Sequence, residues 1–153
     1  YIGVTDNDYG WWYVKNGEID FSYTGLGFND AGCWRIVDGA VDFGCTSVVD
    51  SEYGWWFIRN GSIDFTYTGL AQNEYGWWYV KGGVLDLSYT GFGQNENGWW
   101  YVSDGQVDFT YTGLAVNEYG WWYIRSGMLD FSYTGYVGWY GVNYRVQNGQ
   151  VIF

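Results

Sequence analysis

Apolar and polar positions along the chain repeat every 22 residues, without insertions. Most repeats open with Gly and two aromatic residues, pass through an aliphatic residue to a polar turn, and resume with a short apolar run. A fixed period of this length is typical of solenoids, in which one small unit is copied and stacked. Full repeats begin at Gly10, Gly32, Gly54, Gly76, Gly98 and Gly120, a partial repeat occupies 1–9, and a degenerate repeat at 142–153 is predicted to cap the stack. We therefore predict that 1–153 form a single repeat domain.

A two-residue turn signal lies at positions 7 and 8 of the repeat, counted from its first glycine. Such dipeptides supply the positive φ angles of a type I′ turn, and β-branched and aromatic residues flank them. They are Asn16-Gly17, Asp38-Gly39, Asn60-Gly61, Gly82-Gly83, Asp104-Gly105 and Asn148-Gly149. Each repeat is predicted to form one β-hairpin, followed by a connecting loop of the type Thr-Gly-Leu-Ala-x-Asn-Glu-Tyr, whose apolar Leu or Phe can pack between neighbouring repeats. Because a lone hairpin is marginally stable in water, we expect an all-β fold, a β-solenoid of stacked hairpins with one hairpin per 22-residue repeat.

Alternation on either side of the turn assigns the side chains to two faces. Positions 3, 5, 10 and 12 are predicted to face the core: Trp12, Val14, Ile19 and Phe21 in the first repeat, and Trp56, Ile58, Ile63 and Phe65 in the third. Positions 2, 4, 6, 11 and 13 are predicted to point the other way: Trp11, Tyr13, Lys15, Asp20 and Ser22 in the first repeat, and Trp77, Tyr79, Lys81, Asp86 and Ser88 in the fourth. The second face therefore combines aromatic and polar groups.

The composition and the net charge of the chain limit the classes of partner that it is expected to bind. The chain is 25% aromatic and 48% hydrophobic, so we expect a packed structure rather than disorder. A net charge of −11 disfavours nucleic acid, which binds through cationic side chains, and is compatible with neutral or cationic ligands. No apolar run has the length of a transmembrane helix, so no membrane insertion is expected. The sequence starts inside a repeat, and we expect it to be a piece of a longer chain with an attached domain.

Both cysteines fall in the second repeat, at positions that hold aromatic residues elsewhere: Cys33 at position 2 and Cys45 at position 14. This paired replacement favours a disulfide and an oxidising compartment. Strict alternation places the two on opposite faces, so a bridge requires a bulge or another turn register. The alternative is a pair of small buried thiols.

The Trp-Trp-Tyr run at positions 2 to 4 is the strongest candidate for a binding site. Flat aromatic faces bind sugar rings by apolar contact and quaternary ammonium groups by cation–π attraction. A recurring exposed Trp at position 2 requires a functional explanation, whereas a core role is the alternative for position 3. The candidate ligand-binding residues are Trp11, Trp12, Tyr13, Trp55, Trp56, Trp77, Trp78, Tyr79, Trp99, Trp100, Tyr101, Trp121, Trp122 and Tyr123.

An aspartate recurs at position 11, across the predicted hairpin from the aromatic residue at position 4. Asp64, Asp86 and Asp108 are candidate ligand groups, because a carboxylate accepts hydrogen bonds from sugar hydroxyls or balances a cation. The structural alternative is that the carboxylate accepts a bond from an indole, a phenol or a loop amide. The array is periodic and contains no unique carboxylate pair or nucleophile–base pair, so we expect no enzyme. With no histidine and two cysteines, no metal site is expected, and no motif calls for a cofactor.

The order Gly-x-Trp-Tyr, turn, then Thr-Gly, as in 76–91, resembles the choline-binding or cell-wall-binding repeats of Gram-positive surface proteins and their glucan-binding relatives. The resemblance covers nearly the whole chain. It implies a hairpin solenoid that attaches a protein to choline-bearing teichoic acids, or binds α-glucans, through aromatic pockets between hairpins. By position, the Trp of the family's Trp-Tyr pair matches Trp12, Trp34, Trp56, Trp78, Trp100 and Trp122.

The sequence departs from the family after Thr-Gly, where the pattern has a pocket-forming Trp and this chain has Leu26, Leu70, Phe92, Leu114 and Tyr136. The Trp at position 2 and the Tyr at position 14 offer another aromatic wall, which favours a ligand other than choline, such as a glycan. We expect a non-catalytic module, secreted or on a bacterial surface, that attaches to a cell-wall polymer or other polysaccharide through repeated aromatic sites. The alternative is a structural stalk or protein-binding adhesin segment without small-ligand sites.

Overall fold

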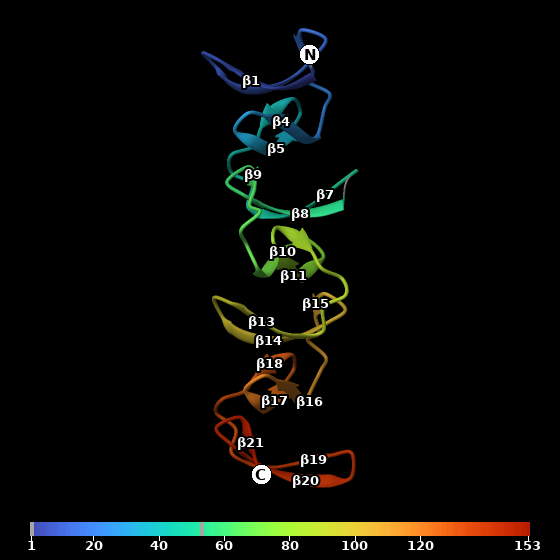
Figure 1. The fold of residues 1–153 in the computed structure, drawn as a ribbon, viewed down its shortest axis with the longest axis vertical. Helices are drawn as coiled ribbons and strands as arrows, with labels where there is room; N and C mark the ends of the chain where they lie inside the picture. The colour runs from blue at the N-terminus through green and yellow to red at the C-terminus, as the bar shows by residue number, and fades with distance from the viewer. Residues whose placement is uncertain (1, 53) are drawn as a thin grey trace. The chain divides into compact units, whose positions relative to one another are not determined.

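A computed structural model describes residues 2–52 and 54–153, which form β-strands and turns and contain no helix. Two compact bodies divide the described chain. The N-terminal body contains the described residues up to Thr68 together with Val80–Leu85, and the C-terminal body contains Gly69–Tyr79 and Asp86–Phe153. Within each body, antiparallel hairpins of successive repeats stack on one another, so the predicted all-β solenoid of stacked hairpins is confirmed (Figure 1).

Each structural unit is built from three strands, and its first strand lies at the end of the preceding numbered repeat. The first strands are Ile2–Asn7 (β1), Gly25–Asn29 (β4), Ser47–Ser51 (β7), Gly69–Asn73 (β10), Gly91–Asn95 (β13), Gly113–Asn117 (β16) and Gly135–Trp139 (β19). The second strands are Gly10–Lys15 (β2), Gly32–Val37 (β5), Gly54–Arg59 (β8), Gly76–Lys81 (β11), Gly98–Ser103 (β14), Gly120–Arg125 (β17) and Val142–Gln147 (β20). The third strands are Glu18–Ile19 (β3), Ala40–Val41 (β6), Ser62–Ile63 (β9), Val84–Leu85 (β12), Gln106–Val107 (β15), Met128–Leu129 (β18) and Gln150–Ile152 (β21).

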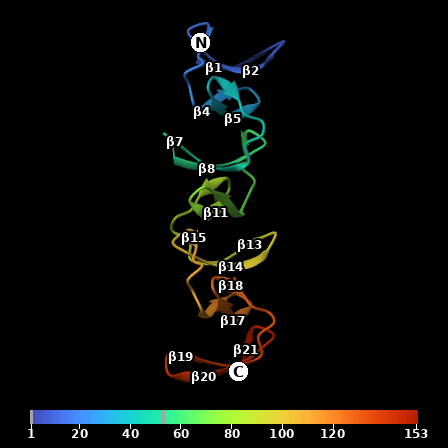
Figure 2. The same ribbon diagram turned by 180° about the vertical axis from the view of Figure 1, so that it is seen from behind.

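The segment predicted to be a connecting loop is the first strand of the main hairpin, so that prediction is wrong. In the C-terminal body, β13 pairs with β14 along its whole length, with Phe92 opposite Tyr101 and Asn95 opposite Gly98 (Figure 2). Gly and Asn in this segment indicated a loop, but they occupy the two ends of the strand. The apolar residue between them, Phe92 in this repeat, is buried and fixes the strand to the core.

The predicted type I′ turns are confirmed. In β8 and β9, Arg59 lies opposite Ser62, and the turn residues Asn60 and Gly61 have φ angles of 51° and 87°. The strand that follows the turn is only two residues long in most repeats. Regular alternation therefore ends at position 10.

The turn glycine at position 8 joins one repeat to the repeat before it. Gly39 accepts a hydrogen bond from the N–H of Tyr13 at 2.7 Å and donates its own N–H to the carbonyl of Tyr23 at 2.8 Å. A Cβ atom at Gly39 would lie 2.6 Å from the carbonyl oxygen of Asp20, so this approach requires glycine. The same pair of bonds recurs along the chain and holds successive hairpins together within each body.

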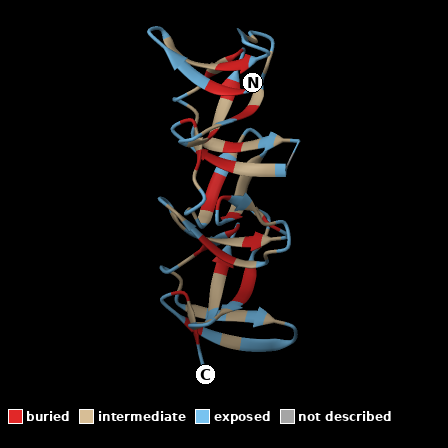
Figure 3. Ribbon diagram, turned by 45° about the horizontal axis from the view of Figure 1, so that its top comes forward, coloured by how far each residue is buried: buried red, intermediate tan, exposed pale blue. Residues whose placement is uncertain are grey.

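The core lies in the middle of the hairpins, at positions 5, 10 and 17, while the first residue of each type I′ turn, at position 7, is exposed (Figure 3). Tyr136, at position 17 of the sixth repeat, is an exception and is exposed. The aliphatic residues at position 5 are the most completely buried: Ile36, Ile58, Val80, Val102, Ile124 and Val146. Position 10, predicted to face the core, is buried or half-buried, as for Ile63 and Ile19. Position 17 was not among the predicted core positions, because it lay in the supposed loop, although its Leu or Phe was expected to pack between neighbouring repeats.

Two predictions about the faces are wrong. Phe21 and Phe65 were predicted to face the core but are 63% and 58% exposed, because the chain turns at Asp20 and Asp64 and alternation stops there. Tyr13 was predicted to point away from the core, yet it is buried in a cluster with Ile36 and Val41 of the next repeat. In a stack, the second face of one hairpin packs on the first face of the next, so both faces are partly buried.

The predicted disulfide is not formed in this structure, in which Cys33 and Cys45 are free thiols. Cys33 lies on the regular strand β5, whereas Cys45 lies beyond the turn at Asp42, where its carbonyl accepts the N–H of Gly61 at 2.9 Å. Both side chains pack in one apolar cluster with Ile58, so the alternative of two small thiols within the core is the one observed. Burial raises the pKa of Cys33 to about 11 and also raises that of Cys45, which keeps both thiols protonated at neutral pH.

Candidate functional site

The Trp at position 3 is held in place by an Asn five residues earlier, at the end of the first strand. The Oδ1 atom of Asn117 accepts the indole N–H of Trp122 at 2.9 Å and the backbone N–H of Tyr119 at 2.9 Å. One amide oxygen therefore caps the two-residue turn of the hairpin and fixes the indole ring. The same bond joins Asn7 to Trp12, Asn29 to Trp34, Asn73 to Trp78 and Asn95 to Trp100.

In five repeats the Phe at position 12 packs edge-on against the Trp at position 3 of the same repeat, whereas the fourth repeat has Leu87 at position 12. Centroid separations run from 5.5 Å in Trp100–Phe109 to 5.9 Å in Trp56–Phe65. Since position 12 is exposed, this pair presents two aromatic walls to solvent. The position 12 residues were missed as site residues because alternation assigned them to the core.

A third wall comes from the position 2 Trp of the preceding repeat. In the N-terminal body, the ring centroid of Trp11 lies 5.4 Å from that of Trp34 and 6.2 Å from that of Phe43. We call this combination an aromatic cage: position 2 of one repeat with positions 3 and 12 of the next. In this first cage the three rings contact one another directly.

Two cages in the C-terminal body enclose open space. A cavity of about 400 Å³ is lined by Trp99, Trp122 and Phe131, together with the polar side chains of Asn117 and Gln150. Trp99 is 36% exposed, so its ring is accessible from solvent. In the last repeat, a smaller cavity of about 110 Å³ is lined by Trp121, Trp139, Tyr144 and Phe153, so this degenerate repeat still builds aromatic walls.

The aromatic residues at positions 4 and 14 form a separate pair and do not line these cages. Tyr79 and Tyr89 stack with centroids 3.7 Å apart and an interplanar angle of 12°. In the third repeat the corresponding pair is Phe57 and Tyr67, and the guanidinium carbon of Arg59 lies 5.3 Å from both ring centroids. Tyr13, Tyr101 and Tyr123, also predicted to bind ligand, belong to such pairs with Tyr23, Tyr111 and Tyr133.

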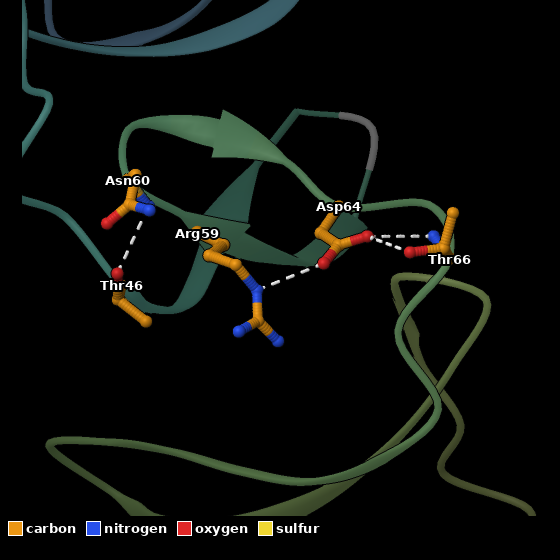
Figure 4. A network of polar contacts seen from close by, with 5 residues as sticks. All are labelled: Thr46, Arg59, Asn60, Asp64 and Thr66. Carbon is orange, nitrogen blue, oxygen red and sulfur yellow. Dashed lines mark hydrogen bonds and ion pairs between the residues drawn. The ribbon is translucent and has the colours of Figure 1, made fainter.

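The recurring aspartate holds the turn after the short strand. Oδ1 of Asp64 accepts the N–H of Thr66 at 2.9 Å and its hydroxyl at 2.5 Å, while Oδ2 pairs with Arg59 at 3.0 Å (Figure 4). The bonds from Thr66 lower the pKa of Asp64. Asp86 and Asp108 make the same contacts with Ser88 and Thr110. The structural alternative, a carboxylate that accepts a loop amide, is confirmed; a ligand role for these aspartates stays a prediction.

The structure therefore brings together only part of the predicted site. The Trp residues of positions 2 and 3 meet between successive repeats, not within one repeat, as Trp11 and Trp34 do. Trp12, Trp55, Trp56, Trp77, Trp78 and Trp100 are half-buried, and Trp121 is 37% exposed. The second repeat has Cys33 at position 2, so the pair Trp56–Phe65 lacks an indole as its third wall.

Among the described residues, no helix could cross a bilayer and no three potential metal ligands lie together.

Comparison with known proteins identifies the repeat. A family model described as choline-binding repeat matches residues 1–20, 22–42, 46–64, 66–86, 88–108 and 110–130. Choline binding protein F from Streptococcus pneumoniae is similar at 20% identity and a TM-score of 0.38, over 100% of this chain and 48% of that chain. CbpJ from Streptococcus pneumoniae TIGR4 is 21% identical, with a TM-score of 0.38, over 99% and 52% of the two chains.

A third similar structure is the modular Cpl-1 endolysin complexed with a peptidoglycan analogue. It is 19% identical, with a TM-score of 0.39, over 84% of this chain and 36% of that chain. The chain thus spans about half, or less, of the length of these structures. A search of individually curated proteins gave no match.

Proposed function

Because the chain belongs to the choline-binding repeat family, we propose that it is a non-catalytic module that binds the quaternary ammonium group of choline. In this proposal the module acts outside a Gram-positive cell. It anchors an attached domain to choline-bearing cell-wall polymers through its aromatic cages.

The observation that carries the proposal is the open cage formed by Trp99, Trp122 and Phe131. Aromatic ring faces attract a quaternary ammonium group through the ring quadrupole and contact its methyl groups at the same time. No Lys or Arg is among the described residues that line this cage, so no cationic side chain competes with choline for the aromatic rings. The net charge of −11 raises the local concentration of cations around the module.

The energies involved make a single cage a weak site. Each ring contributes roughly 1 kcal/mol of cation–π attraction, so three rings give an affinity on the order of millimolar. Repetition converts such sites into firm attachment, because a polymer held at one cage is presented to the next at high effective concentration. A stalk without small-ligand sites, the alternative from the sequence, is disfavoured because it gives no reason for cavities lined by half-exposed indoles.

A titration of the full chain, followed by tryptophan fluorescence, tests the proposal. Choline chloride is compared with ethanolamine hydrochloride, which has the same charge and hydroxyl group but a primary ammonium. We expect choline and tetramethylammonium chloride to change the fluorescence at millimolar concentrations, and ethanolamine to bind at least about tenfold more weakly because its ammonium is strongly hydrated. No response to choline, or an equal response to ethanolamine, would contradict a cage for quaternary ammonium groups.

A further inference from the structure

A second groove adjoins the cage of Trp99, Trp122 and Phe131. It has a volume of about 380 Å³ and is lined by Tyr89, Thr90, Phe92, Trp99, Val116 and Glu118, among others. Trp99, Asn117 and Tyr119 line both the groove and the cage. A ligand whose cationic end occupies the cage therefore has a continuous path across Trp99 into the groove.

Most polar groups of the groove are already committed to the fold. The hydroxyl of Tyr89 donates to the carbonyl of Phe92 at 2.6 Å, and the hydroxyl oxygen of Thr90 accepts the N–H of Asp104 at 3.1 Å. Glu118 differs, because it is exposed and forms no ion pair with any described residue. Glu118 itself lines the groove, and its negative charge adds to the burial that raises the pKa of Tyr89.

We propose that this groove binds a neutral pyranose ring of the same polymer whose choline group occupies the cage. The proposal rests on the proposed function. The exposed indole of Trp99 offers a flat surface for the apolar C–H face of a sugar, and the carboxylate of Glu118 accepts hydrogen bonds from sugar hydroxyls. No Lys or Arg is among the described residues that line the groove, so a phosphate group has no cationic partner there and faces the charge of Glu118.

The chain contains a natural comparison for this groove. An equivalent groove of about 440 Å³ in the N-terminal body is lined by Tyr23, Thr24, Leu26, Arg35 and Glu52, among others. Glu52 and Glu118 occupy the same repeat position, 21. In that repeat, however, Cys33 replaces the Trp of position 2, and Arg35 replaces the Tyr of position 4. The groove of Glu52 therefore has a carboxylate without an indole platform, and we expect it not to bind sugar.

Indole ¹⁵N–¹H resonances of the full chain provide the test. Choline chloride is added to saturation, and methyl glucopyranoside, methyl galactopyranoside or N-acetylglucosamine is then titrated. We expect at least one sugar to move the Trp99 signal further. Glu118→Ala should weaken this response about tenfold, the effect of losing a hydrogen bond to a charged group, whereas Glu52→Ala should leave it unchanged.

Either of two results would contradict the proposal that this groove binds a pyranose ring. In the first, none of the sugars moves the Trp99 signal; in the second, the sugars move it equally in Glu118→Ala and in the unmodified chain. A response of Trp99 to inorganic phosphate instead of sugar would also overturn it. The first step of the same experiment reports on the cage separately, because choline should move the signal of Trp122. If choline fails to do so, the proposed function is wrong whatever the sugars do.

Discussion

The indole Nε1 of Trp56 is buried without a hydrogen-bond partner, and the residue five positions before it is Ser51. The two preceding repeats and the three following ones have Asn at this place, and its Oδ1 accepts the indole N–H. In the third repeat, the shorter side chain of Ser51 bonds instead to the carbonyl of Gly54 at 2.9 Å. An unmade hydrogen bond of a buried donor costs about 1–3 kcal/mol, so this repeat carries a local defect.

We predict that Ser51→Asn repairs this defect. The new Oδ1 should accept the Trp56 N–H and raise the free energy of unfolding by about 1 kcal/mol. The reverse substitution, Asn95→Ser, removes the partner of Trp100 and should lower stability by a similar amount. Urea unfolding of both variants checks the pair, and a neutral or destabilising Ser51→Asn would show that the Asn–Trp bond does not stabilise the hairpin.

Substitutions at two turn glycines distinguish the cost of backbone strain from the cost of a close contact between repeats. Gly17 and Gly39 have nearly equal φ angles of 83° and 82°, but a Cβ atom at Gly17 meets nothing within 4 Å. We predict that Gly17→Ala costs about 1 kcal/mol from its positive φ angle alone. Gly39→Ala should cost at least about 2 kcal/mol more, because its Cβ meets the backbone of Asp20. Equal melting temperatures for the two variants would mean that the close approach does not hold the repeats together.

Acid should destabilise the turns held by aspartate. Hydrogen bonds from Thr66 and Ser132 lower the pKa of Asp64 and of Asp130 below the ordinary value of 3.8. A carboxyl whose pKa is lower in the folded state adds stability that is fully present above the unfolded value and is lost as the pH falls through the folded value. We therefore expect melting temperatures to fall below about pH 4. The fall should be smaller in Asp64→Asn, and an identical pH profile in that variant would contradict this role.

The two Trp residues of one repeat should respond differently to truncation. Trp100 bonds to Asn95 and packs against a buried cluster with Val102 and Val107, so Trp100→Ala should cost on the order of 3 kcal/mol. Trp99 is exposed at the cage, so Trp99→Ala should keep the fold and weaken choline binding. Urea unfolding and choline titration of both variants check this, and the cage assignment fails if Trp99→Ala proves the more destabilising change.

The sequence allowed the fold class, the 22-residue period and the type I′ turns to be predicted, because each depends on local chemistry repeated at one spacing. Asn60 and Gly61 are an example: their φ angles follow from residue type alone. The strand Gly91–Asn95 could not be predicted in this way, because its Gly and Asn residues also suit a loop. Its pairing with the next strand depends on the burial of Phe92 between repeats.

The candidate site was harder to predict because it is formed between repeats. Alternation placed Phe131 and its equivalents in the core, since nothing in the pattern showed that the aspartate at position 11 bends the chain outward. The spacing of Asn117 and Trp122, five residues apart and repeated along the chain, was the signal that could have located the position 3 Trp at the hairpin end. The partner of Trp99 lies in the following repeat, which no single-repeat pattern reveals.

Calorimetric titration of choline chloride into the full chain, Phe131→Ala and Phe65→Ala tests the cage most directly. Phe131 and Phe65 make the same edge-on contact with Trp122 and Trp56, at 5.8 Å and 5.9 Å, and both are exposed. They differ in the third wall of the cage, which comes from position 2 of the preceding repeat. This residue is Trp99 in the cage of Phe131 and Cys33 in the repeat before Phe65. We predict that Phe131→Ala removes one choline site and that Phe65→Ala binds choline as the unmodified chain does. Equal choline binding by all three proteins, or an equal loss in the two variants, would contradict the cage as the choline site.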